Sequence, residues 1–211
     1  MTEARTAILD RIRSAAGGEG NPADAYASIP RGYLRTGGLD AEQRRRHLQE
    51  RLRDYDAQVV ETNTAGTAES IAGILRRHGQ KQVIVAEGFP AEMLPPDLAF
   101  TLESKAGVRE LDDCDGVITT CTVAIAFTGT IVLTHGRGEG ARRLTLVPDR
   151  HLCVVRAEQI VETVPEAADR LAPLATHPMT WISGPSATAD IEMTRIRGVH
   201  GPRFLNVVLV R

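Results

Sequence analysis

The sequence has few cysteines and no apolar segment long enough to span a membrane. None of its apolar runs approaches the roughly 20 residues that cross a bilayer, and the N-terminus MTEARTAILDRIRSAAGG lacks the apolar core of a signal peptide. The three cysteines, Cys114, Cys121 and Cys153, include no C-x-x-C pair. This spacing argues against a disulfide framework and against a self-contained zinc or iron–sulfur site. We therefore expect a cytoplasmic protein with buried thiols.

Excess charge and nucleotide-binding motifs are also missing. The net charge of -2 gives no reason to expect nucleic acid or an anionic membrane as a partner. Neither G-x-G-x-x-G in its strand-to-helix setting nor G-x-x-x-x-G-K-[ST] occurs, and residues 184–188 lack the second glycine of a G-x-S-x-G serine-hydrolase motif. What remains is an ordinary globular composition, with 42% hydrophobic and 25% charged residues, typical of one main domain.

The first 38 residues differ from the rest in their sequence pattern, with one amphipathic segment followed by a segment rich in glycine and proline. Residues 2–16 place apolar side chains at helical spacing and indicate an amphipathic helix. Residues 17–38 are rich in glycine and proline, which is typical of a linker or a long loop. Part of this segment should dock on its own domain or on a partner chain, because it contains apolar side chains at Tyr26, Ile29, Tyr33 and Leu34. We divide the chain into an N-terminal helix and linker, residues 1–38, and an α/β domain, residues 39–211.

A second helix is expected from Asp40, which forms a capping box with Gln43. Its buried face should comprise Leu48, Leu52 and Tyr55. Its arginines are interpreted as a solvated helix face rather than a phosphate site, because no aromatic or glycine-rich segment accompanies Arg44, Arg45, Arg46, Arg51 and Arg53.

The clearest fold signal is a β-α-β pattern. Residues 57–61 and 82–86 are strand-like, and residues 67–78 between them have the apolar spacing of a helix. A buried strand reached through a helical crossover indicates a parallel sheet covered by helices. The loop at residues 87–96 then follows the carboxyl end of a strand, where open α/β sheets usually bind ligands.

From Gly116 onward, strands follow one another closely. The predicted strands are 117–119, 123–127, 130–134, 144–147, 152–155, 179–182 and 204–210. Thr128 and Gly129 indicate a tight turn, and Pro165 opens one further helix. Strand 179–182 is expected to be buried, and the last strand should complete the core. The fold class is α/β, with a mixed, mostly parallel sheet flanked by helices.

Four loops combine glycine with polar side chains: residues 127–130, 135–140, 183–190 and 198–202. Successive backbone N–H groups near arginine form an anion nest. The second loop, with Arg137 and the following Arg142, is the most phosphate-like, although a flexible hairpin loop has the same composition. In the third loop, anion binding competes with helix capping by Ser186, Thr188 and Asp190.

Two histidines lie in suggestive positions. Asp149, His151 and Cys153 alternate along a strand and share one face, which suits a metal or a thiolate but is more typical of a partly buried, hydrogen-bonded strand. His200 lies next to Gly201 in a turn. It can contact a ligand or hydrogen-bond the loop backbone.

Four segments together resemble the lactate utilisation protein C family, which carries the LUD domain: residues 124–133, 143–155, 183–192 and 198–202. The resemblance implies a fold of the sugar-isomerase, CoA-transferase and folate-cyclo-ligase type. It also implies a role in oxidising L-lactate to pyruvate with two partner proteins, at least one of which carries iron–sulfur clusters. No cofactor is expected in this chain.

One position departs from the family pattern. The family usually has an acid before the threonine-glycine-threonine turn, where this chain has Phe127. Phenylalanine cannot act as a base or orient a ligand through charge. Either the activity is lost or altered, or another acid such as Asp149, Asp190 or Glu192 serves, or the acid was never catalytic.

The leading hypothesis is a subunit of a lactate-oxidation system that binds a small anionic ligand at the strand ends. The alternatives are an autonomous enzyme acting on a phosphorylated or CoA-linked carboxylic acid, and a docking module whose N-terminal arm binds partners. The predicted ligand-binding residues are Thr128, Gly129, Thr130, Arg137, Arg142, Ser183, Gly184, Ser186, Thr188, Asp190, His200 and Gly201.

Overall fold

The computed structural model describes residues 2–16, 21–188, 196–197 and 201–211. The chain forms two compact units, residues 1–33 and 34–211. The first unit contains the expected helix, α1 (Thr2–Ala15), and a second one, α2 (Pro22–Ala27). Sequence reasoning missed α2 because Pro22 was interpreted as a breaker. Proline is favoured in the first turn of a helix, and here the Asn21 side chain caps that turn by accepting a hydrogen bond from the Ala23 N–H at 3.0 Å.

The second unit carries four further α-helices, α3 (Ala41–Asp54), α4 (Thr67–Arg77), α5 (Val108–Asp113) and α6 (Val164–Leu171). Its strands are β1 (Gln58–Thr62), β2 (Val83–Val85), β3 (Phe100–Leu102), β4 (Gly116–Thr119), β5 (Val123–Ile125), β6 (Thr130–Leu133), β7 (Arg150–Arg156), β8 (Ile160–Val161), β9 (Thr180–Ile182), β10 (Ala187–Thr188), β11 (Ile196–Arg197) and β12 (Phe204–Val210). No helix in the described residues has the length and apolar character needed to cross a membrane.

Six strands form a parallel sheet in the order β1-β12-β7-β4-β2-β3. The predicted β-α-β unit is present, and its strands are parallel members of one sheet. They are not neighbours, however, because β12, β7 and β4 lie between β1 and β2. The expected apolar strand at residues 204–210 is β12, which occupies an interior position of this sheet.

A separate four-stranded sheet, ordered β8-β5-β6-β9, is mixed: β5-β6 and β6-β9 are antiparallel and β5-β8 is parallel. Strands β10 and β11 form a third, two-stranded antiparallel sheet. Strands β5 and β6 are antiparallel and are joined through the predicted turn at Thr128 and Gly129, where Gly129 has φ of 65°. The predicted fold class, α/β with a mostly parallel sheet flanked by helices, is confirmed. The one mixed sheet expected from the sequence is divided in the structure, with its predicted strands shared between the six-stranded and the four-stranded sheets.

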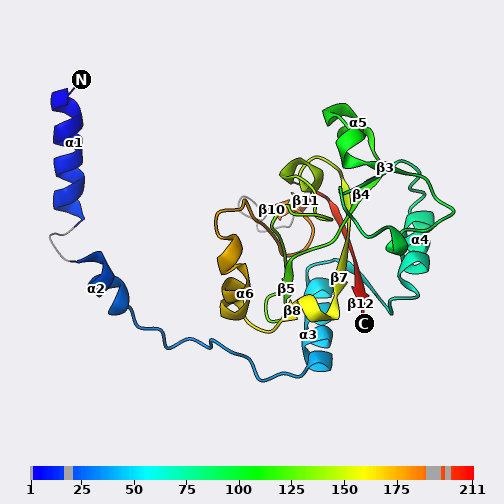
Figure 1. Ribbon diagram of the computed structural model, residues 1–211, viewed down its shortest axis with the longest axis horizontal. Coiled ribbons are helices and arrows are strands. Elements are labelled where there is room, and N and C mark those ends of the chain that lie inside the picture. The colour runs from blue at the N-terminus through cyan, green and yellow to red at the C-terminus, as the bar shows by residue number, and fades with distance from the viewer. Residues whose placement is uncertain (1, 17–20, 189–195, 198–200) are drawn as a thin grey trace. The chain divides into compact units, whose positions relative to one another are not determined.

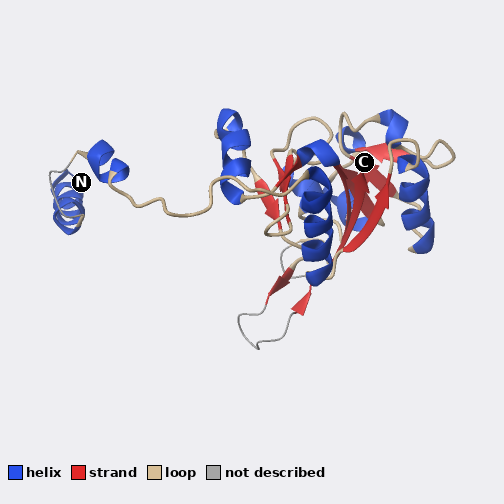
Figure 2. Ribbon diagram, turned by 90° about the horizontal axis from the view of Figure 1, so that it is seen from below, coloured by secondary structure: helices blue, strands red, loops and turns tan. Residues whose placement is uncertain are grey.

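The two sheets and their helices form layers (Figures 1 and 2). Helix α4 covers one face of the six-stranded sheet, and the other face packs on the four-stranded sheet. Helix α6 covers the outer face of the four-stranded sheet through Ala167 and Leu171. The deepest core therefore lies between the sheets, where aliphatic side chains from both meet, among them Ala124, Ile131, Leu133, Val155 and Val207.

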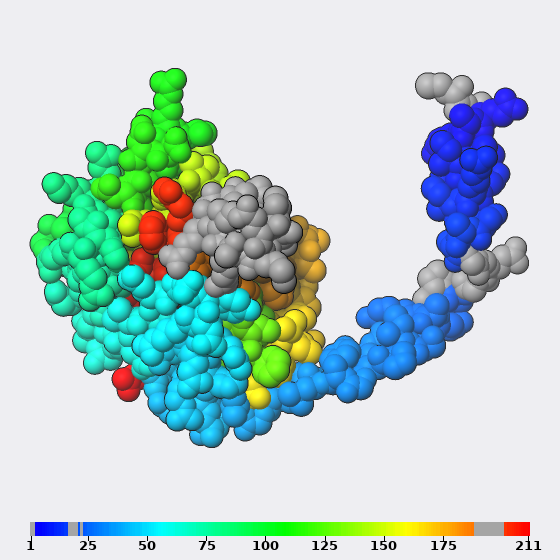
Figure 3. Space-filling view, turned by 180° about the vertical axis from the view of Figure 1, so that it is seen from behind, coloured from blue at the N-terminus to red at the C-terminus, as the bar shows by residue number. Residues whose placement is uncertain are grey.

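Helix α3 begins with the predicted capping box of Asp40 and Gln43, and it buries Leu48 and Leu52 in the core between the sheets. It forms a broad part of one face of the second unit (Figure 3, cyan). The prediction of a fully solvated arginine face is wrong for Arg45, which is only 5% exposed and ion-paired with Glu42 and Glu61. A buried guanidinium requires such partners, and the sequence did not show that Glu61 of β1 would face α3.

Two predicted strands differ in the structure. Residues 142–145 form a 3₁₀ helix in place of a strand, because Leu144 is buried while Leu146 is exposed. In a strand, these two side chains would share one face. The segment at 179–182 is strand β9, but it lies at the edge of its sheet and Trp181 is 47% exposed, so it is not a buried strand.

A candidate anion-binding cavity between the two sheets

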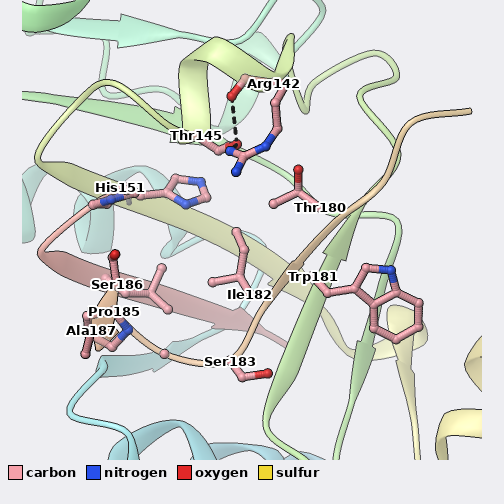
Figure 4. Close-up of a pocket in the computed structure, with 14 residues that line it drawn as sticks. Arg142, Thr145, His151, Thr180, Trp181, Ile182, Ser183, Pro185, Ser186 and Ala187 are labelled. Atoms are coloured by element: carbon pink, nitrogen blue, oxygen red, sulfur yellow. Dashed lines mark hydrogen bonds between the residues drawn. The ribbon is translucent and has the colours of Figure 1, made fainter. Parts of the chain in front are cut away.

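A cavity of about 250 Å³ lies between the two sheets, where β7 and β12 begin (Figure 4). Edge strand β9 lines one side, and the loop at residues 183–187 continues that wall. The remaining lining comes from the 3₁₀ helix that precedes β7 and from both strand starts, namely Arg142, Thr145, His151, Gly201, Pro202 and Leu205. The cavity is therefore at the amino ends of these parallel strands, and the loop at residues 87–96 does not line it.

The cavity brings together five of the residues predicted from sequence, which come from three separate loops: Arg142, Ser183, Gly184, Ser186 and Gly201. Thr128, Gly129, Thr130 and Arg137 are not part of its lining. Thr188 lies in β10, one residue beyond the lining. Asp190 and His200 lie outside the described residues.

Two of the predicted loops are joined by a short chain of hydroxyl groups. The Oγ1 atoms of Thr128 and Thr130 are 2.7 Å apart, and Thr130 Oγ1 lies 2.8 Å from Ser183 Oγ. Ser183 in turn lines the cavity. The threonine turn therefore supports the cavity wall from behind instead of forming it.

Within its described residues, the loop after β9 leads into strand β10 and not into a helix. The backbone N–H of Ser186 donates to the Pro202 carbonyl at 2.8 Å, and β10 pairs with β11 in an antiparallel ribbon. The alternative in which Ser186 caps a helix is therefore wrong, while the residues that follow Thr188 lie outside the described residues. This N–H of the predicted anion nest is therefore already bonded and does not contribute a donor to the cavity.

Two glycines of these loops approach the end of α3. Gly184 has φ of 85°, and a Cβ atom there would lie 2.5 Å from Tyr55 Cβ. Gly129 has φ of 65°, and its Cβ would lie 2.7 Å from Arg51 Cβ. Both positions need the left-handed backbone and the small volume that glycine provides. Their role in the structure is to pack the loops on α3.

The loop at residues 135–140 contains an internal carboxylate where an anion nest was predicted. Glu139 is buried, and its Oε2 accepts a hydrogen bond from the Thr134 N–H at 2.6 Å. Its Oε1 accepts one from Thr122 Oγ1 at 2.6 Å. The loop lies at the carboxyl ends of β2 and β4, where the Gly138 N–H donates to the Glu87 carbonyl. The Gly136 N–H of this loop also donates to Glu139 Oε2, at 3.4 Å, so two of the loop's backbone donors are used within the protein.

His151 is the residue that the sequence-based site list missed. Its side chain is 1% exposed, its Nε2 lies 2.7 Å from Thr119 Oγ1, and its Nδ1 has no hydrogen-bond partner within the described part of the chain. The ring projects into the cavity beneath Arg142 and Thr145 (Figure 4). Burial lowers the pKa of His151 to about 4, so the imidazole is neutral at pH 7.

The sequence signal for His151 was its alternation with Asp149 and Cys153, but these three side chains do not converge. Asp149 is ion-paired with Arg203, and Cys153 lies in the core between the sheets. Across residues 2–16, 21–188, 196–197 and 201–211, no three such groups are placed to hold a metal ion. Phe127, at the position where the family pattern has an acid, is 60% exposed and outside the cavity lining.

The cavity is positively charged on its described surface. Arg142 donates from Nη1 to Thr145 Oγ1 at 3.1 Å. No aspartate or glutamate is among the described lining residues, and no carboxylate of the described chain pairs with Arg142. One guanidinium, several hydroxyl groups and a buried neutral imidazole form a suitable environment for a small anion.

The LUD domain family matches residues 33–210 of this chain. A protein of Deinococcus radiodurans named lactate utilization protein C is 43% identical over 166 residues, which are 77% of each chain. The chain belongs to the lactate utilization protein C family. A Bacillus subtilis protein of the same name is 25% identical over 228 residues and covers 96% of this chain and 94% of its own.

A solved structure supports the same assignment at the level of the fold. The crystal structure of a DUF162 family protein from Deinococcus radiodurans matches with a TM-score of 0.72 and 35% identity. The match covers 82% of this chain and 100% of that one. The resemblance to the lactate utilisation protein C family inferred from the sequence is thereby confirmed.

Proposed function

We propose that this protein is a subunit of a cytoplasmic L-lactate utilisation system and that it binds a small carboxylate in the cavity between its sheets. The names of its relatives support the first part. The observation that supports the second is the Arg142 guanidinium, which faces a cavity whose described lining contains no carboxylate. A guanidinium recognises a carboxylate through paired charge-assisted hydrogen bonds.

The size of the cavity favours a small ligand. Its volume of about 250 Å³ is below the roughly 300–1,000 Å³ of pockets that enclose drug-sized molecules. A CoA-linked acid would need more room. The loop at residues 135–140, predicted to be phosphate-like, contains the buried Glu139 carboxylate, which would repel a phosphate there. Both observations count against an autonomous enzyme acting on such substrates.

In this proposal, electrons from lactate oxidation pass to iron–sulfur partner proteins. The chain has three cysteines, Cys114, Cys121 and Cys153, and all are buried. An iron–sulfur cluster is commonly held by four thiolates. The proposal therefore assigns the clusters to the partners, as the family resemblance implies.

Gene deletion with complementation tests both parts of this proposal. Cells without the gene should fail to grow on L-lactate as sole carbon source and should recover with the wild-type gene. Arg142→Gln should fail to restore growth, because the cavity loses its positive charge. Arg137→Gln is the matched control, since Arg137 lies in the loop at residues 135–140, outside the cavity lining. Normal growth of the deletion strain, in the absence of a paralogue, would refute the role in lactate utilisation.

A further inference from the structure

His151 combines two properties that are seldom found together. It is almost completely buried, yet its Nδ1 atom has no hydrogen-bond partner in the described chain. Leaving a buried polar atom unpaired is unfavourable, so such an atom beside a cavity indicates a group that the cavity is built to receive. The opposite ring nitrogen, Nε2, is held by Thr119, which is itself fully buried on β4.

This inference rests on the proposed function. We infer that the ligand is a short 2-hydroxy or 2-oxo carboxylate, whose carboxylate binds Arg142 and whose C2 oxygen hydrogen-bonds His151 Nδ1. Arg142 and His151 line the same cavity and project toward the same space (Figure 4). Arg142 alone would accept any small anion. The imidazole adds the requirement for a second oxygen next to the carboxylate.

The hydrogen bond between Thr119 and His151 explains how one site accepts both the 2-hydroxy acid and the more oxidised 2-oxo acid. A threonine hydroxyl can donate or accept a hydrogen bond. When Nε2–H donates to Thr119 Oγ1, Nδ1 is an acceptor and receives the O–H of a 2-hydroxy acid. When Thr119 Oγ1–H donates to Nε2, Nδ1 carries the proton and donates to the C=O of a 2-oxo acid. The neutral ring thus matches either ligand by changing its tautomer, without acquiring charge.

Other groups near His151 do not take over this role. Cys153, two residues along the same face of β7, has its thiol directed to the Thr120 carbonyl at 3.6 Å. The hydroxyl of Thr145 is shared between the Arg142 side chain and the Arg142 carbonyl. His151 is therefore the buried group of the described lining with an unpaired hydrogen-bonding atom.

Calorimetric titration of the full-length protein with three acids of the same carbon number tests the inference. L-lactate and pyruvate should bind at least about ten-fold more tightly than propionate, which lacks the C2 oxygen, because one hydrogen bond contributes roughly this factor. Arg142→Gln should weaken binding of all three acids. Equal binding of the three by the wild-type protein would overturn the assignment of His151 and leave a general carboxylate site.

Two substitutions of His151 distinguish its two nitrogens while keeping a polar side chain. In His151→Gln, the longer amide reaches toward Thr119 and vacates the position of Nδ1, so the preference over propionate should disappear. In His151→Asn, the shorter amide occupies the position of Nδ1, so part of the preference should remain. A preference that survives unchanged in His151→Gln contradicts the inference.

The ¹⁵N NMR spectrum of the His151 ring supplies a measurement that misfolding cannot imitate. Its Nδ1 signal should shift in opposite directions on addition of L-lactate and pyruvate, since one ligand donates and the other accepts. An unchanged Nδ1 signal while both acids bind would overturn the inference but not the proposed function. Absence of any binding to the wild-type protein would overturn both ligand proposals, whereas the growth experiment would still decide the role in lactate utilisation.

Discussion

A neutral histidine buried beside a cavity makes the protein sensitive to acid through a single side chain. Burial holds the pKa of His151 at about 4, below its ordinary value of 6.5. The unfolded chain therefore binds one more proton than the native state when the pH lies between these two values. The contribution to stability is fully present above pH 6.5 and is lost as the pH falls toward 4.

The first prediction concerns this loss of stability. Between pH 6.5 and 4, His151 should remove about 3 kcal/mol from the free energy of unfolding. Urea unfolding of the wild type and of His151→Gln at several pH values measures the difference, since other titrating groups act equally in both. Parallel curves for the two proteins would show that His151 titrates normally in the native state.

At the scale of elements, the end of α3 holds two loops in place. Gly129 and Gly184 approach Arg51 and Tyr55 so closely that no Cβ atom fits. The loop containing Gly184 also lines the cavity. The position of the cavity wall therefore depends on the contact between this loop and α3.

Replacing Gly184 by alanine should reduce stability by about 2 kcal/mol or more, because alanine is strained at positive φ and its Cβ would clash with Tyr55. Gly73 is the matched control. It lies in α4, an added Cβ there meets no atom within 4 Å, and alanine should stabilise the helix by about 0.5–1 kcal/mol. Denaturant unfolding measures both changes, and a neutral Gly184→Ala would mean that the loop is not constrained by α3.

Short-range sequence patterns predicted most helices and strands of the second unit. The conformation of the other segments depends on contacts between residues far apart in the sequence. The capping box at Asp40 and Gln43 and the apolar spacing of α4 depend on neighbours in sequence, so these elements were predictable. Leu144 and Leu146 alternate as in a strand, but only Leu144 reaches the core, and the segment is helical. Burial at one position and exposure at the other cannot be obtained from a pattern that treats both alike.

The same reasoning applies to the cavity. Arg142, Ser183 and Gly201 were predicted because glycine-rich polar loops indicate ligand contact in general. His151 could not be identified as a cavity residue, since the pairing of β7 with β12 and the position of β9 bring its walls together. Glu139 could not be recognised as the internal partner of its own loop for the same reason.

For the whole molecule, the first unit should be dispensable for the stability of the second. None of the four hydrophobic core clusters contains a described residue before Leu48. Removing residues 1–33 should therefore leave the thermal midpoint of the remaining domain within about 2 °C, a change of at most about 1 kcal/mol for a domain of this size. Differential scanning calorimetry of both forms provides the test, and a large decrease would show that the first unit stabilises the domain.

The truncated form also tests the reading of residues 1–38 as a partner-binding arm. Tyr26, Ile29 and Tyr33 are exposed, and exposed apolar side chains commonly mark interaction surfaces. Loss of co-purification with the proposed iron–sulfur partners, at an unchanged thermal midpoint, would support that role. Retained co-purification would assign partner binding to the α/β domain.

The position of β12 has a consequence for how the domain folds during synthesis. Strand β1 pairs with β12 alone in the described sheet, and their register joins Val60 to Val208. While the ribosome makes the residues between them, both edges of β1 are unpaired and α4 lacks part of the surface on which it packs. Such long-range pairing slows folding and leaves incomplete sheets open to aggregation. We therefore expect the nascent domain to need protection from aggregation, such as chaperones provide, until residues 204–210 have left the ribosome.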